Sequence, residues 1–410
     1  MDLARRVPDR RLVAWTGIAL ALVCGAVVLA HVTWAIPIRR PDLGVIELGT
    51  AGLVVQLAAL VAGVMALHLA RGPAVRWLIA AEGAVCLFAY GAPGLAFALG
   101  LVAWWAVIDA RRLGRARFAL AAVLFVALDA CAWRSDRLAS PAKLFSMMFA
   151  MRLFVFTYDR WQNEHEPTPL GDFLAFMLPA PLVIVPPYLS IIPLFDGFGA
   201  KLRPELTPAR LRAIGKHLAL AILFGGMRVA MDRLGLRGEH AQPATMHWRL
   251  LANILGLAAI AHLLIPMLLL HGIEERLPLD RPLLATRFVE LWQRFSVHLK
   301  DAQVFLFYTP ALLRLRRANR YLAIVLATFW TILVGNTLVH AAVHYCFLPD
   351  TARLIGWSVV ANAVMAAALA ADLCYEERWS RRGRRPPRTV PRLVIGWLLT
   401  MTLASVIAML

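Results

Sequence analysis

The chain carries few charged residues for its length. Of its 410 residues, 17% are charged and 60% are hydrophobic, with a mean hydropathy of +0.66. A soluble domain would carry about 25% charged residues. This balance excludes a disordered chain, a coiled coil and a soluble multidomain protein, and it predicts an all-α, polytopic membrane protein.

Cysteine and lysine are also scarce. The five cysteines lie in or beside apolar runs without a CxxC spacing, which excludes a disulfide framework and a cysteine metal site. Only four of the 43 basic residues are lysines, and the excess of arginine, alanine and leucine fits a GC-rich bacterial genome. We therefore expect a bacterial cytoplasmic (inner) membrane protein. The chain lacks GxSxG, Walker and GxGxxG motifs, so serine-hydrolase and phosphate-cradling chemistry have no support.

Apolar runs near 20 residues are long enough to cross a bilayer. The expected spans are about 13–36, 46–70, 77–91, 94–109, 118–132, 143–158, 217–231, 248–271, 320–346, 354–374 and 391–410. Two more apolar stretches predict re-entrant segments. Residues 170–198 contain five prolines, which a regular helix does not tolerate. Residues 303–313 are too short to cross and are followed by arginines.

The basic residues are distributed unevenly between the loops. With a cytoplasmic N-terminus, the inside loops carry 32 lysines and arginines and the outside loops carry 8. Cytoplasmic loops of membrane proteins are enriched in these residues. The net charge of +18 is therefore explained by topology rather than by a nucleic-acid partner, and the C-terminus is expected outside.

Polar residues inside apolar spans are costly, so each one is a candidate functional residue. Asn336, His340 and His344 recur every four residues and share one helix face. Histidine at such a place acts as a general base or a metal ligand, but no carboxylate stands between the two histidines as in HExxH. A packing hydrogen bond between helices is the alternative.

Other polar residues of the apolar segments are interpreted as mainly structural. Glu82 and Asp129 are expected to form hydrogen bonds inside the bundle, with a proton relay as the alternative. Residues 284–300 have an amphipathic pattern that predicts a helix in the cytoplasmic interface, and His298 lies on it. The isolated histidines expected to be structural are His31, His68, His262 and His271.

Four stretches resemble the membrane-bound O-acyltransferase (MBOAT) family over roughly residues 145–345. They are Tyr158-Asp159 with DFLAFMLPAPLVIVPPYLSIIPLFDGF (172–198), LFGGMRVAMDRL (223–234), ELWQRFSVHLKDAQVFLFYTPAL (290–312) and WTILVGNTLVHAA (330–342). The resemblance implies about eleven transmembrane helices with re-entrant segments 170–198 and 303–313. It divides the chain into N-terminal helices (1–142), a catalytic core (143–346) and C-terminal helices (347–410).

The resemblance also implies an activity and a site. An acyl group would move from a cytoplasmic acyl-CoA or acyl-carrier-protein thioester to a hydroxyl of a glycan, lipid or small molecule. His340 would act as general base and His298 as a second catalytic residue. The supporting residues would be Asn336, Ser296, Trp292 and Tyr308. No bound cofactor or metal is expected, nor a nucleic-acid partner.

This chain departs from the family pattern in the third stretch. Ser296 stands where many relatives have histidine or asparagine, and Val304 and Phe305 stand in place of an Arg-Asp pair. An inactive, scaffold-like member of the family is therefore one alternative. A transporter or flippase for a lipid-linked or anionic solute is another, suggested by the broken segments and by Glu82, Asp129 and Arg228.

Overall fold

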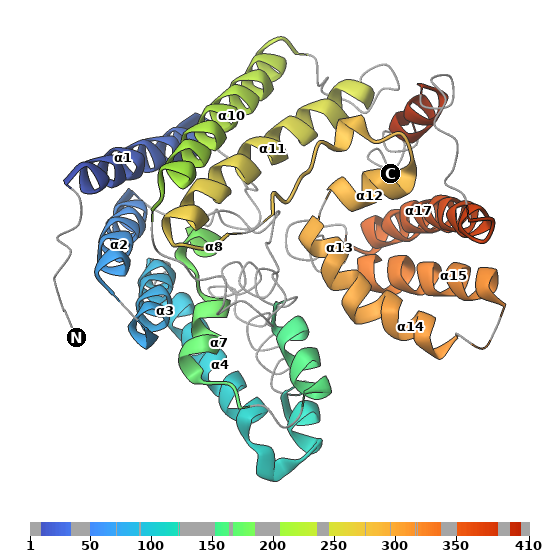
Figure 1. The fold of residues 1–410 in the computed structure, drawn as a ribbon, viewed down its shortest axis with the longest axis horizontal. Coiled ribbons are helices and arrows are strands. Elements are labelled where there is room, and N and C mark those ends of the chain that lie inside the picture. Colours follow the sequence, from blue (N-terminus) through green and yellow to red (C-terminus); the bar gives the residue numbers. More distant parts are fainter. Residues whose placement is uncertain are drawn as a thin grey trace.

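The computed structural model is helical throughout the part of the chain that it describes (Figure 1). That part comprises residues 10–33, 50–70, 72–89, 92–121, 123, 152–163, 167–184, 206–235, 246–274, 276–295, 297–315, 317, 319–337, 351–383 and 394–402. These ranges contain no β-strand, as the composition predicts.

Four helices within these ranges are long and apolar enough to cross a membrane: Ala51–Leu69, Pro208–Arg233, Leu250–Leu270 and Val359–Ser380. Shorter apolar helices cover Gly17–Val28, Phe97–Asp109, Leu170–Ile184 and Arg320–Asn336. The chain therefore has the architecture of a helical membrane protein, but the eleven expected spans are not shown. Most of the expected spans 118–132 and 143–158 lies outside the described residues.

The N-terminal elements surround the largest apolar core. They are α1 (Arg10–Thr33), α2 (Thr50–Leu69), α3 (Pro73–Phe88), α4 (Ala92–Asp109), η1 (Arg111–Leu113), α7 (Leu170–Met177), α8 (Ala180–Ile184), α10 (Pro208–Arg233) and α11 (Met246–Leu270). The local sequence explains some helix starts. Pro73 and Pro208 occupy first turns, where the missing N–H has no cost, and Thr207 accepts a hydrogen bond from the Arg210 N–H.

The C-terminal elements form a second group. They are η4 (Pro282–Leu284), α12 (Phe288–Phe295), α13 (Val297–Gln303), η5 (Val304–Tyr308), α14 (Thr309–Arg314), α15 (Arg320–Phe329), η6 (Trp330–Asn336) and α17 (Thr351–Ser380). Figure 1 shows α15 beside α17, with α12 to α14 around them. A smaller apolar cluster joins α12, η6, α17 and the helical residues 394–402. The expected domain boundaries at 142 and 346 remain predictions.

The proline-rich stretch 170–198 is interrupted where it is described. Helix α7 ends at Met177, and Leu178 and Pro179 separate it from α8. Gly83 on α3 packs against this break so closely that a Cβ there would overlap the carbonyl oxygen of Leu178. The predicted break is therefore confirmed up to Ile184, and residues 185–198 lie outside the described part.

The amphipathic stretch 284–300 starts later than its pattern predicts. Helix α12 begins at Phe288, because Pro282 starts a short 3₁₀ turn and Asp372 of α17 accepts a hydrogen bond from the Val289 N–H (3.0 Å). Leu284, expected on the apolar face, is exposed. The expected short dip at 303–313 is helical, with the wide π-helical turn η5 followed by α14.

Ion pairs connect stretches that the charge pattern assigns to one side of the membrane. They are Arg76–Asp172, Arg210–Glu274, Arg287–Glu376 and Arg320–Glu377. Apart from Asp172 at the start of α7, each residue lies in or next to a loop predicted to be inside. The contacts agree with a common side for these loops, and the compartment that this side faces stays a prediction.

Glu82 of α3 and His271, directly after α11, form a fully buried pair. The His271 Nδ1–H donates to the Met267 carbonyl oxygen (2.6 Å), and Nε2 lies 2.9 Å from both carboxylate oxygens of Glu82. A carbonyl only accepts, so Nδ1 carries a proton and a further proton lies between Nε2 and the carboxylate. The pair as a whole is neutral, which lowers the cost of its burial. The hydrogen bond inside the bundle that is expected for Glu82 is therefore confirmed.

Replacing Glu82 with Ala should destabilise the protein strongly. The change would leave His271 buried without its partner, which costs about 3–5 kcal/mol. We expect a clearly lower melting temperature in detergent than for Asp232→Ala, because Asp232 lies at the helix surface, where its i,i+4 pair with Arg228 contributes about 0.5 kcal/mol. The double variant Glu82→Ala/His271→Ala should lose less than the two single losses combined. Additive losses would show that the two side chains are not coupled.

Candidate functional site

The residue expected to carry the chemistry lies outside the described part of the chain. The structure describes the helix of the fourth stretch up to Thr337, so nothing is shown for His340 and His344. Ser296 also lies outside the described residues. The candidate site residues in the described part are His298, Trp292, Tyr308 and Asn336.

His298 lies on α13 and is buried, with 3% of its surface exposed. Its Nε2–H donates to the Arg276 carbonyl oxygen at 2.9 Å. This bond fixes the tautomer of the neutral ring, so Nδ1 is the nitrogen that carries the lone pair. His298 thus holds the segment after α11 against α13.

A chain of buried amides links the third and fourth stretches. Gln303, at the end of α13, donates from Nε2 to Asn336 Oδ1 (3.0 Å). Asn336 Nδ2 donates in turn to Asn362 Oδ1 on α17 (2.7 Å), and Asn362 Nδ2 donates to Thr337 Oγ1 (2.8 Å). Both ends of the Asn336 side chain are engaged, so Asn336 connects three segments of the bundle.

The same two stretches both contain π-helical turns. η5 (Val304–Tyr308) and η6 (Trp330–Asn336) contact each other, and Gly335 makes this contact possible. A Cβ at Gly335 would lie 2.9 Å from Cδ2 of Phe307, closer than packed carbons tolerate. π-Helical turns are rare and are frequent at functional sites.

Trp292 and Tyr308 lie on two different elements, α12 and η5. Trp292 is half-buried on α12 and packs against the apolar cluster that includes Ile332. Tyr308 is half-buried at the end of η5.

Sequence reasoning missed Gln303 and Asn362. Asn362 lies inside the expected span 354–374, and the rule that made Asn336 a candidate would have found it as well. Gln303 lies at the edge of the expected re-entrant segment and has only 1% of its surface exposed. Its Oε1 has no hydrogen-bond partner among the described residues, which leaves a buried acceptor beside both wide turns.

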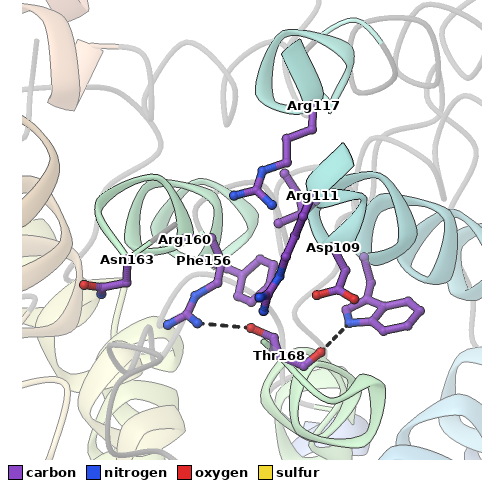
Figure 2. Close-up of a pocket in the computed structure, with 9 residues that line it drawn as sticks. Asp109, Arg111, Arg117, Phe156, Arg160, Asn163 and Thr168 are labelled. Atoms are coloured by element: carbon purple, nitrogen blue, oxygen red, sulfur yellow. Dashed lines mark hydrogen bonds between the residues drawn. The ribbon is translucent and has the colours of Figure 1, made fainter. Parts of the chain in front are cut away.

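A second polar feature lies at the end of α4, away from the expected site residues (Figure 2). It is a small pocket with a cavity volume of about 10 Å³, enough for about one water molecule. Its lining residues are Trp105, Ile108, Asp109, Arg111, Arg117, Phe156, Arg160, Asn163 and Thr168. The sequence signal for it is the arginine-rich loop 110–117, which the charge pattern explains by topology alone.

The fold and these buried polar contacts define the class of the chain as a helical membrane protein. Neither the protein-family models nor the curated proteins contain a match to this sequence. The described residues also contain no group of three or more histidine, cysteine, aspartate or glutamate side chains that would hold a metal ion.

Replacing Asn336 with Ala should destabilise the protein without disturbing the apolar core. The change leaves polar atoms of Gln303 and Asn362 buried without a partner, at about 1–3 kcal/mol for each group. Thr331→Val is the matched control in the same wide turn, because the Thr331 hydroxyl bonds only to the Ala327 carbonyl of its own helix. We expect thermal melting in detergent to fall well below the control for Asn336→Ala. Equal melting of the two variants would contradict a connecting role for Asn336.

Proposed function

We propose that this chain is an O-acyltransferase of the bacterial inner membrane, diverged within the MBOAT family, with His340 as general base. The proposal includes the eleven spans, the cytoplasmic N-terminus and an acyl-CoA or acyl-carrier-protein donor. The acceptor is a hydroxyl of a glycan, a lipid or a small molecule. The resemblance of the four sequence stretches supports it, together with one structural observation.

That observation is the contact between the third and fourth stretches. Gln303 and Asn336 are separated by 33 positions in the sequence and meet through a buried hydrogen bond. Asn336 precedes His340 by four positions, one helical turn in a regular helix. A mechanism that needs both stretches in one site requires this kind of contact.

The proposed reaction needs one proton transfer and one acyl transfer. His340 takes the proton of the acceptor hydroxyl while the hydroxyl oxygen attacks the thioester carbonyl carbon. The C–S bond then breaks, the acyl group stays on the acceptor oxygen, and the proton passes to the leaving thiolate. A site enclosed in an apolar bundle disfavours the competing attack by water.

The amide chain has a positioning role in this proposal. Asn336 uses both ends of its side chain in described hydrogen bonds, so it fixes the helix rather than the substrate. The Oε1 atom of Gln303 is the better candidate for a substrate contact, because it is a buried acceptor without a partner among the described residues. A hydroxyl of the acceptor is a donor that would satisfy it.

The structure weakens one argument for the transporter alternative, namely the charged residues in apolar segments. Glu82 is neutralised by His271, and Arg228 pairs with Asp232 one turn away (3.2 Å). Asp129 lies outside the described residues. Two of the three charges that suggested an ion or solute path thus have local structural partners.

His340→Ala should abolish acyl transfer while leaving the fold intact. Loss of a general base costs about 10²–10⁴-fold in rate. We would compare cell-envelope glycans and lipids by mass spectrometry in wild-type and variant strains, which reports the acceptor and the mass of the acyl group together. The purified variant should also transfer no acyl group from an acyl thioester in vitro.

His344→Ala is the matched control, with the same substitution four positions further along the same expected span, 320–346. We expect its transfer rate to stay within about threefold of wild type, since the proposal gives it no proton to move. A folded His340→Ala protein with full transfer would refute the proposal. Solute flux into proteoliposomes without any acyl donor would favour the transporter instead, and a wild-type protein that transfers from no thioester but retains a stable partner would favour the scaffold.

A further inference from the structure

Two arginine-bearing segments that are distant in the sequence lie together beside α15 and α17. One is the segment 314–320 between α14 and α15, and the other is the end of α17 with the turn that follows it (375–383). They meet where the Arg381 guanidinium carbon lies 4.9 Å from the centre of the Tyr321 ring, and Figure 1 shows the start of α15 and the end of α17 at the same end of this helix pair. Their exposed arginines form a surface that we term the arginine patch: Arg314, Arg317, Arg320, Arg378, Arg381 and Arg382.

The acids of α17 leave most of this positive charge unpaired. The acidic residues of the helix are Asp372, Glu376 and Glu377. The first two both pair with Arg287, and Glu377 is shared by Arg320 and Arg381, whose Nε atoms lie 3.6 Å and 3.1 Å from its Oε1. The arginines of the patch that form no ion pair with an acid of the described part are Arg314, Arg317, Arg378 and Arg382.

The sequence beside the patch adds further positive charge and no acid. Segment 314–320 contains no acidic residue, and residues 384–392, which follow the patch, contain four more arginines and no acid. A cluster of arginines directly after an apolar helix is typical of a segment that attracts anionic lipids.

The position of the patch suits the headgroup layer of a membrane. It begins in the last turn of the candidate span Val359–Ser380. Trp379 lies in the same turn, with its ring centroid 6.2 Å from that of Tyr375, and the Arg382 guanidinium carbon lies 5.9 Å from the centre of the Trp379 ring. Tryptophan and tyrosine are enriched in the interfacial layer. A guanidinium stacked on a ring keeps the N–H groups of its edge for phosphate oxygens.

We propose that the arginine patch binds the phosphate headgroups of anionic lipids. Guanidinium groups hold phosphate oxygens through paired, charge-assisted hydrogen bonds. The patch is an exposed surface, so a headgroup needs no cavity to reach it. Its place at the end of a membrane helix favours a lipid over a soluble acidic protein. The proposal rests on the membrane class of the chain and uses none of the residues proposed for acyl transfer.

The test is lipid binding to the full-length protein in detergent. Native mass spectrometry would compare phosphatidylglycerol with phosphatidylcholine of the same acyl chains, and the wild type should prefer phosphatidylglycerol. Arg378→Gln/Arg382→Gln should weaken binding of phosphatidylglycerol at least about tenfold and leave that of phosphatidylcholine unchanged. Its melting temperature without added lipid should equal that of the wild type, because both side chains are exposed and pair with no described acid.

Arg111→Gln/Arg112→Gln is the matched control. It removes the same charge from another exposed segment of the predicted inside face, and its phosphatidylglycerol binding should stay within about twofold of wild type. Equal weakening in both double variants would show diffuse surface charge and overturn the proposal, as would a wild type without preference for phosphatidylglycerol. A wild type that binds poly-glutamate but does not prefer phosphatidylglycerol would assign the patch to an acidic protein instead.

Discussion

The described structure depends on one constraint: a polar group buried in an apolar bundle must find its partner within the protein. Water is absent from the bilayer core, so an unsatisfied polar or charged group there is costly. The chain meets this constraint with a small number of contacts between segments that are distant in sequence. Glu82 and His271 are 189 positions apart, and their shared proton makes the pair neutral.

The amide chain through Gln303, Asn336 and Asn362 pairs buried polar groups that carry no charge. It connects α13, η6 and α17, so one set of hydrogen bonds fixes the relative positions of three elements. The wide turns η5 and η6 meet beside it because Gly335 has no side chain. Buried hydrogen bonds and close packing thus occur at the same place, where segments 290–312 and 330–342 come together.

Charge near the membrane boundary serves a different purpose. The arginines of loop 110–117 are expected to set the topology. Arg117 is buried against the ring of Phe118, whereas Arg111 remains exposed at the opening of the pocket.

By itself, the sequence determined the all-helical membrane class, the break before Pro179 and the need of Glu82 for a hydrogen bond inside the bundle. These follow from local composition, from the backbone chemistry of proline and from the cost of burying charge. It misplaced the start of α12, because that start depends on a hydrogen bond to Asp372, 83 positions away. Only the tertiary structure decided that Glu82 pairs with His271, that Gln303 and Asn362 flank Asn336, and that three arginines share one pocket. Such pairings are contacts across the bundle, and no local pattern in the chain encodes which distant residue will satisfy a buried group.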